Sequence, residues 1–215
     1  MKRMVMAMPG NEGFAGALAA SLGAAKAGLE WRRFPDGESY VRLSDDVAGA
    51  DVIMVCTLAD PDPQIPSLIY AARTARDLGA ARLTLVAPYL AYMRQDAVFN
   101  PGEAVSSKYF GELVSRCFDA LVTVDPHLHR HKDLSAIYSI PAGVAHAAPL
   151  IGAWVSDHVE NPLIVGPDEE SEQWASEIAR HCRAPVTVLR KARSGDRDVR
   201  ITLPDLSQWR GLQPV

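Results

Sequence analysis

Short apolar runs alternate with longer segments of helical periodicity along the whole chain. Strands are predicted at Arg3–Met8, Leu29–Phe34, Asp51–Thr57, Leu83–Ala87, Ala120–Val124, Pro162–Val165 and Pro185–Leu189. Helices are predicted at Gly13–Leu22, Pro66–Leu78, Ala104–Phe118, Ala145–His158 and Glu170–Cys182. Strands that are apolar throughout, separated by amphipathic helices, indicate a parallel sheet covered on both faces. The pattern therefore predicts an α/β fold.

The segment Ser139–Gly143 contains a proline and a glycine and is the expected boundary between two domains, residues 1–140 and 141–215. The second unit has too few predicted strands to close a sheet comfortably. An apolar run also begins at Gly211–Val215, where the sequence stops. We therefore expect the second domain to be incomplete and the chain to be a fragment of a longer protein.

Composition narrows the classes of partner. The net charge of -4 argues against nonspecific nucleic-acid binding, which needs Lys and Arg massed on one face. Three widely spaced cysteines, an odd number, fit a reducing compartment better than a disulfide framework. No stretch approaches the roughly 18 apolar residues of a membrane helix. The composition predicts a cytoplasmic protein with neither a nucleic-acid partner nor a membrane partner.

Ligands of parallel sheets bind beyond the carboxyl ends of the strands, so the polar residues after each apolar run are site candidates. Arg94, Gln95 and Asp96 follow the run Leu83–Ala87. The guanidinium of Arg94 suits phosphate oxygens, and Gln95 can hydrogen-bond a base or a ribose. The alternative is that Arg94 and Asp96 are surface charges on a long loop.

Histidines cluster after the run Ala120–Val124. His127 can help to position a magnesium-phosphate group, whereas His129 and His131 fit solvated loop positions. A multi-histidine zinc centre, as in a zinc hydrolase, is an alternative. That alternative is weakened because no later predicted strand ends in histidine.

Two further clusters follow the last two predicted strands. Asp168, after Pro162–Val165, suits Mg²⁺ or ribose hydroxyls, although a helix N-cap is the favoured reading of this residue taken alone. The stretch Arg190–Arg197 carries four cations with Ser194 and Gly195, and predicts a mobile loop that closes on polyphosphate. A solvated charge run is the usual alternative for such a stretch.

Phe34–Tyr40 contains a Pro-Asp-Gly turn between two β-like runs. The sequence contains no P-loop, no dinucleotide-binding glycine fingerprint and no nucleophile elbow. In their order, five motifs resemble those of the ribose-phosphate diphosphokinase family. They are Phe34-Pro-Asp-Gly-Glu38 with Val41-Arg42-Leu43, Arg94-Gln95-Asp96, Asp125-Pro-His127, Gly166-Pro-Asp168 and Lys191-Ala-Arg193.

The resemblance implies two phosphoribosyltransferase-like α/β domains, the second incomplete here, in a homo-oligomer between a dimer and a hexamer. It implies transfer of the pyrophosphoryl group of ATP to ribose 5-phosphate, with Mg²⁺. Binding of ATP would involve Phe34, Asp36, Gly37, Glu38, Arg94, Gln95 and Asp96. His127 and Asp168 would hold the metal, and Lys191 and Arg193 would stabilise the transferring group.

The chain departs from the family pattern at two places. Pro126–Tyr138 is rich in His and Asp, and Glu169-Glu170-Ser171 replaces a run of small residues. The family's paired aspartates and 5-phosphate loop also have no counterpart before Val215. A non-catalytic homologue that regulates a true synthetase therefore remains an alternative. Ordinary phosphoribosyltransferase activity is disfavoured, because that chemistry needs the same loop.

Overall fold

The structure is a computed structural model that describes the backbone of residues 1–128, 130–193, 199–202 and 206–215. Side chains are described for residues 1–128, 130–189 and 206–215. The chain divides into two compact units, Met1–Ala145 and His146–Val215. Each unit has its own sheet and its own hydrophobic core.

The first unit is built on a six-stranded sheet in the order β2-β1-β5-β6-β7-β8. Its strands are β1 (Arg3–Ala7), β2 (Ala25–Ala27), β5 (Asp51–Val55), β6 (Arg82–Ala87), β7 (Ala120–Val124) and β8 (Ala142–Ala145). All neighbouring pairs are parallel. The predicted parallel α/β fold is confirmed for this unit.

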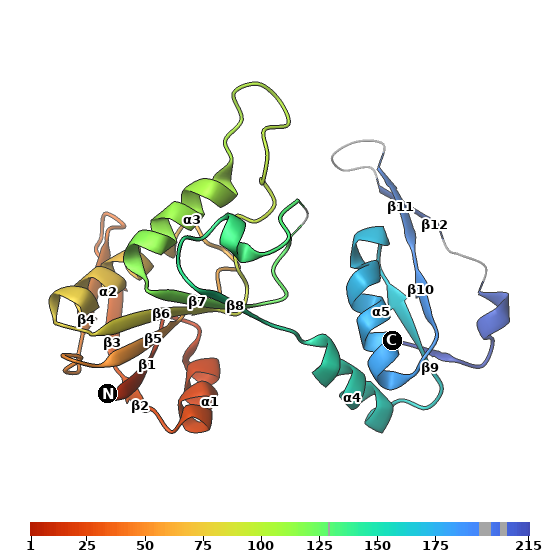
Figure 1. Cartoon of the computed structure of the whole chain (residues 1–215), viewed down its shortest axis with the longest axis horizontal. Helices are drawn as coiled ribbons and strands as arrows, with labels where there is room; N and C mark the ends of the chain where they lie inside the picture. The colour runs from red at the N-terminus through yellow and green to blue at the C-terminus, as the bar shows by residue number, and fades with distance from the viewer. Residues whose placement is uncertain (129, 194–198, 203–205) are drawn as a thin grey trace. The chain divides into compact units, whose positions relative to one another are not determined.

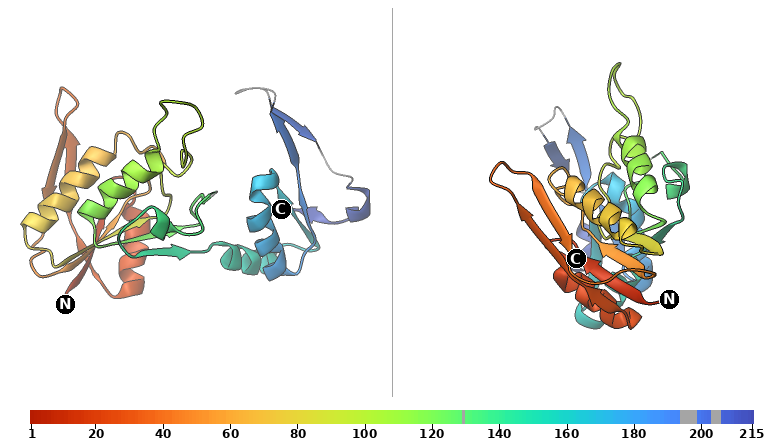
Figure 2. Two further views of the ribbon diagram at one scale, coloured as in Figure 1. Left: turned by 45° about the horizontal axis from the view of Figure 1, so that its top comes forward. Right: turned by 90° about the vertical axis from the view of Figure 1, so that its left-hand side faces the viewer.

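Helices cover the sheet on two faces, as Figures 1 and 2 show. Helix α1 (Glu12–Leu22) packs on the face formed by Val5 and Ile53. Helices α2 (Ile65–Asp77) and α3 (Ser106–Cys117) pack on the other face, which carries the larger core. Adjacent residues of an extended strand point to opposite faces, so β5, buried at all five positions, is apolar from Val52 to Val55. Its first residue, Asp51, is a buried carboxylate that forms an ion pair with Arg3.

The predicted strand Leu29–Phe34 forms, but not in the main sheet. β3 (Leu29–Arg33) pairs antiparallel with β4 (Ser39–Leu43) in a separate hairpin. Trp31 lies on the face of the hairpin that meets α2, where its Nε1 donates to Ser67 Oγ at 2.7 Å. On the other face of β3 the residues Glu30 and Arg32 are charged. This alternation of apolar and charged residues is typical of a half-exposed hairpin strand rather than of a central strand.

The division between the two units falls after β8. Residues 142–145, which were expected to begin the second domain, pair in parallel with β7, Leu121 opposite Ala142. Proline and glycine in Ser139–Gly143 indicate a linker by local chemistry, but an edge strand tolerates both residues. The start of the helix predicted at Ala145 is corrected for the same reason: α4 spans Ala148–His158.

The second unit has a three-stranded parallel sheet in the order β10-β9-β13. Its strands are β9 (Pro162–Gly166), β10 (Val186–Val188) and β13 (Gln213–Pro214). Helices α4 and α5 (Glu172–Cys182) pack against each other, and a core cluster consists of Val155, Ile164, Ala175 and Ala179. Single 3₁₀ turns occupy Leu134–Ala136 in the first unit, and Glu169–Ser171 and Ser207–Trp209 in the second.

Strands also form where a mobile loop was predicted. β11 (Arg190–Arg193) pairs antiparallel with β12 (Val199–Thr202), Lys191 opposite Ile201. The expectation of a loop is wrong for residues 190–193, because a run of cationic residue types does not prevent the main chain from pairing with a neighbouring strand. The rest of that stretch, residues 194–197, lies outside the described part of the chain. None of the described helices combines the length and the apolar character needed to cross a bilayer.

Candidate functional site

The loops that follow the strands of the first unit are cross-linked along the carboxyl edge of the sheet. Asn11, 5% exposed, joins the loops after β1 and β5. Its Oδ1 accepts from Thr57 N at 2.8 Å, and its Nδ2 donates to the carbonyls of Met8 and Pro9. A buried amide with this many partners fixes both loops in one arrangement.

The loop after β5 is joined in turn to the loop after β6. Leu58 N donates to Tyr89 O at 3.1 Å, and the hydroxyl of Tyr92 donates to Asp62. Burial, that hydrogen bond and the nearby carboxylates raise the pKa of Tyr92 to about 12. The phenol therefore stays protonated and remains a hydrogen-bond donor at neutral pH.

The loop after β6 is joined to the loop after β7 by an ion pair. Arg130 Nη1 donates to Asp96 Oδ1 at 2.8 Å, and the side chain of Asp96 is only 2% exposed. The guanidinium of Arg130 also lies 4.9 Å from the ring centroid of Phe99. This contact holds two of the predicted motifs next to each other.

The three residues of the Arg94-Gln95-Asp96 motif differ in their exposure to solvent. Arg94 is exposed, Gln95 is half-buried and Asp96 is buried. Asp96 faces the protein and binds Arg130, and its Oδ2 has no hydrogen-bond partner in the described structure. The predicted role of Arg94 and Gln95 in ATP binding fits their exposure, whereas the visible contact of Asp96 is one that positions the loop.

The backbone of these loops departs from ordinary geometry at two residues. Tyr92 has φ 60° and Asp125 has φ 39°, both in the left-handed region that side chains other than Gly seldom adopt. Such conformations cost about 1–3 kcal/mol and cluster at functional sites. His127, two residues after Asp125, is half-buried on the same loop. His129 lies outside the described residues.

The Phe34–Glu38 turn closes the β3–β4 hairpin. Phe34 N donates to Glu38 O, Gly37 N donates to Phe34 O, and Gly37 has φ 92°. Asp36 Oδ1 accepts from Glu38 N at 3.1 Å, so this carboxylate also stabilises the turn. In the part of the chain that the structure describes, no hydrogen bond or ring contact joins this turn to the loop of Arg94.

The ring of Phe34, 39% exposed, is held by its neighbours on the outer face of the hairpin. It meets Tyr40 edge to face, with 6.0 Å between ring centroids. The guanidinium of Arg32 lies 4.6 Å from the Phe34 centroid and 4.2 Å from that of Tyr40. The sequence motif did not reveal these two supporting side chains.

Asp168 follows β9 in the second unit and forms a helix cap. Its Oδ1 accepts from Ser171 N at 3.1 Å, while Ser171 Oγ accepts from Asp168 N at 3.2 Å. The capping alternative for Asp168 is therefore confirmed. A carboxylate can cap with one oxygen and bind a ligand through its remaining lone pairs, so the predicted metal role stays a prediction.

Lys191 and Arg193 lie in β11, of which the structure describes the backbone. Their side chains lie outside the described residues. Within the described part of the chain, no group of three His, Cys, Asp or Glu side chains could hold a metal ion.

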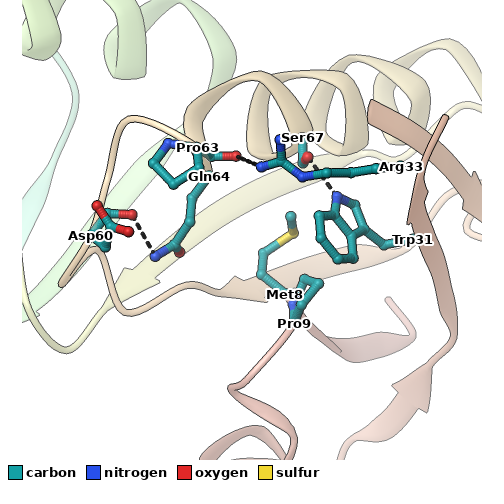
Figure 3. A pocket seen from close by; sticks show the side chains of 8 residues that line it. All are labelled: Met8, Pro9, Trp31, Arg33, Asp60, Pro63, Gln64 and Ser67. Atoms are coloured by element: carbon teal, nitrogen blue, oxygen red, sulfur yellow. Dashed lines mark hydrogen bonds between the residues drawn. The ribbon is translucent and has the colours of Figure 1, made fainter. Parts of the chain in front are cut away.

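A pocket that the motifs did not predict lies at the ends of β1 and β5 (Figure 3). It has a volume of about 250 Å³, and its walls include Met8, Trp31, Arg33, Asp60, Gln64 and Ser67. These residues come from three separate segments of the chain, which explains why no local motif pointed to them.

Comparisons with known proteins agree with the fold and the motifs. Residues 3–117 match the family model for the N-terminal domain of ribose phosphate pyrophosphokinase. Ribose-phosphate pyrophosphokinase of Methanopyrus kandleri is 37% identical over 183 residues, which are 83% of this chain and 62% of that protein. The enzyme of Saccharolobus solfataricus is 36% identical over 167 residues, 77% of this chain and 56% of that protein.

A solved structure is similar in fold. The crystal structure of phosphoribosylpyrophosphate synthetase from Mycobacterium smegmatis matches with a TM-score of 0.79 and 22% identity, covering 94% of this chain and 67% of that one. The fold thus defines a parallel α/β protein of this structural class. The chain belongs to the ribose-phosphate pyrophosphokinase family, as the motifs indicated. It spans about three fifths of the length of the curated relatives that it matches.

Proposed function

We propose that this chain supplies the nucleotide-binding and charge-stabilising part of a ribose-phosphate diphosphokinase. The observation that carries the proposal is the Asp96–Arg130 ion pair, which joins the loop of Arg94 to the loop of His127 at one edge of the sheet. That edge is where parallel sheets bind ligands. Membership of the family supports ATP and ribose 5-phosphate as the proposed substrates at this edge.

The reaction suits these side-chain types. The anomeric hydroxyl of ribose 5-phosphate attacks the β-phosphorus of ATP and loses its proton, and the bond from that phosphorus to the oxygen bridging to the α-phosphorus breaks. AMP leaves with the bridging oxygen. Charge spreads over the equatorial oxygens, so catalysis comes from positioning and from cations, the role we propose for Lys191 and Arg193.

Mg²⁺ is the cofactor of the proposal, and the carboxylate of Asp168 is the kind of oxygen donor that this ion prefers. Mg²⁺ usually keeps several waters and takes only one or two protein ligands together with substrate phosphates. A cage of three protein ligands is therefore not required, in keeping with the described side chains. His127 and Asp168 are the proposed ligands, and the ion would neutralise polyphosphate charge.

The Phe34–Glu38 turn suggests that binding involves more than one copy. The ring of Phe34 is held by Arg32 and Tyr40 yet remains 39% exposed, and no described contact joins it to the loop of Arg94. We propose that the turn reads adenine in a homo-oligomer, with Asp36 and Glu38 accepting from the amino group.

The test of this function measures binding and turnover separately. Isothermal titration of the chain with ATP and Mg²⁺ should show binding that Arg94→Gln weakens by about tenfold or more. A protein that continues this chain with the C-terminal portion of the Methanopyrus kandleri relative should release AMP from ATP and ribose 5-phosphate. Lys191→Ala should slow that release by about 10²–10⁴-fold.

Lys2→Ala, which removes an exposed lysine beside β1, is the matched control and should leave turnover unchanged. Turnover unaffected by Lys191→Ala would refute the role of β11. Nucleotide binding without any AMP release would refute catalysis and favour a non-catalytic homologue.

A further inference from the structure

The pocket at the ends of β1 and β5 lies at the topological switch point of the sheet, where the strand order changes direction: β2 lies on one side of β1, and β5 and β6 lie on the other. β1 is followed by α1 on one face, and the neighbouring β5 is followed by α2 on the other face. Between two such strands the loops separate and leave a crevice, the usual ligand position in open α/β sheets. Asn11 holds the two loops in place beside this crevice.

One wall of the pocket is a rigid aromatic ring. Trp31 Nε1 donates to Ser67 Oγ at 2.7 Å, and that hydroxyl donates to Ser39 Oγ at 3.0 Å. Ser67 is only 2% exposed, so this chain of hydrogen bonds fixes the indole from behind. A fixed indole offers flat apolar surface at little cost in conformational entropy, and it favours a planar ligand.

A cation with weak partners lies beside the indole. Arg33 donates to the carbonyls of Pro63 at 3.3 Å and Gly37 at 3.4 Å, both long contacts to neutral oxygens. Within the described part of the chain, no carboxylate forms an ion pair with it. An anion would make shorter, charge-assisted bonds with the same guanidinium.

The opposite end of the pocket accepts hydrogen bonds. Gln64 Nε2 donates to the main-chain carbonyl of Asp60 at 2.9 Å, which orients the amide (Figure 3). The carboxylate of Asp60 is exposed and has no ion-pair partner among the described residues. Asp60 can accept hydrogen bonds from amino or ring N–H groups of a ligand.

We propose that this pocket binds a small planar nitrogen heterocycle that carries an anionic group. The ring lies against Trp31, its N–H groups face Asp60, and the anion binds Arg33. The volume of about 250 Å³ is below that of drug-sized sites, so the anionic end extends toward solvent. The site does not depend on the proposed kinase function, because it uses none of the residues assigned to that reaction.

Binding at this pocket also reaches the adenine-reading turn. Arg33 Nη1 contacts Gly37 O within the Phe34–Glu38 turn, and its Nη2 contacts Pro63 O beside the pocket. An anion that draws the guanidinium inward competes with the Gly37 carbonyl. Occupancy should therefore alter the environment of the turn.

The test is a ¹H–¹⁵N NMR titration of the Trp31 indole N–H, identified by its loss in Trp31→Phe. Adenosine monophosphate should shift this resonance along one saturable curve, with Kd below about 1 mM. Adenosine has the ring without the anion, and inorganic phosphate the anion without the ring. Each of these two compounds should bind about tenfold more weakly than adenosine monophosphate. Arg33→Gln should raise the Kd of adenosine monophosphate by a similar factor.

Arg94→Gln is the control that separates the pocket from the proposed kinase site, and it should leave the Trp31 shift intact. Loss of that shift in Arg94→Gln, an unchanged Kd in Arg33→Gln, or the absence of any saturable shift would each overturn the proposal. Spectra of the free variants verify folding. Asp60→Asn, on the pocket's other side, should also weaken binding. A normal titration alongside failed AMP release would refute only the kinase function.

Discussion

The two units use the same kind of parallel sheet but stabilise it to different extents. In Met1–Ala145, six strands are covered by α1 on one face and by α2 and α3 on the other. In His146–Val215, three strands pack with two helices, and the described core cluster has four buried residues. Buried apolar area grows with the number of covered strands, so the first unit should provide most of the stability.

The loops at the strand ends differ in the same way. In the first unit Asn11, Tyr92 and Arg130 join loops that are far apart in sequence. In the second unit Asp168 is bonded to Ser171, three residues away. Long-range contacts can preorganise a binding surface, whereas a local cap only begins a helix.

The largest expected effect is on independent folding. Residues 1–145 expressed alone should unfold cooperatively in urea, because their core is complete within that segment. Residues 146–215 expressed alone should show no cooperative transition by circular dichroism, because about 70 residues with so small a described core cannot offset their conformational entropy. A cooperative transition in the shorter piece would remove the contrast between the units.

Two matched glycine substitutions test the packing of each unit. A Cβ at Gly111 in α3 would lie 2.6 Å from Ile137 Cγ2, and one at Gly152 in α4 would lie 2.4 Å from His181 Cβ. Gly111→Ala and Gly152→Ala should each cost about 1–3 kcal/mol, because backbone must move to relieve the overlap. Chemical denaturation should assign each loss to the unit that carries the substitution.

Gly13→Ala is the control for both, because a Cβ there meets nothing within 4 Å. Alanine inside α1 should stabilise the first unit slightly, by about 0.5–1 kcal/mol. Equal losses in all three variants would mean that the overlaps at Gly111 and Gly152 have no special effect.

A further expected effect concerns a carboxylate that joins elements of the first unit. Asp119 accepts from Leu83 N and from Arg76 Nη2, each at 2.7 Å. Burial opposes ionisation of Asp119, but these hydrogen bonds and the charges of Arg76 and Arg82 outweigh it and lower the pKa. Asp119→Asn should therefore cost roughly 1–2 kcal/mol at neutral pH.

The pH dependence follows from the lowered pKa. As pH falls, Asp119 is protonated in the unfolded chain at a higher pH than in the folded protein. Ionised Asp119 therefore stabilises the folded state above the ordinary aspartate pKa, and this stabilisation is lost as pH falls through the lower pKa of the folded state. Urea unfolding from about pH 6 to about pH 2 should show the variant and the wild type converging. In the second unit, the exposed pair of Glu177 with Arg180 is the comparison, and Glu177→Gln should change nothing measurable.

Local sequence patterns were sufficient to predict most of the helices and strands. Mostly apolar runs predicted β1, β5, β6, β7 and β9 within a residue or two of their observed bounds, because a strand covered on both faces must be apolar at most of its positions. The cap at Asp168 was equally legible, since its partner is three residues away. The short strand β2 and the paired ribbon of β11 and β12 went unpredicted, because pairing with a neighbour rather than side-chain pattern defines them.

By itself, the sequence determined the order of most strands and helices, the family and the residues that resemble its motifs, because these depend on residue types and on short spacings. Only the tertiary structure decided that residues 142–145 complete the first sheet, that Asp96 turns inward to Arg130, and that Trp31 and Arg33 line a pocket with Asp60. Each of these features joins segments far apart in the chain. Such contacts depend on how covered strands stack side by side, which no local pattern encodes.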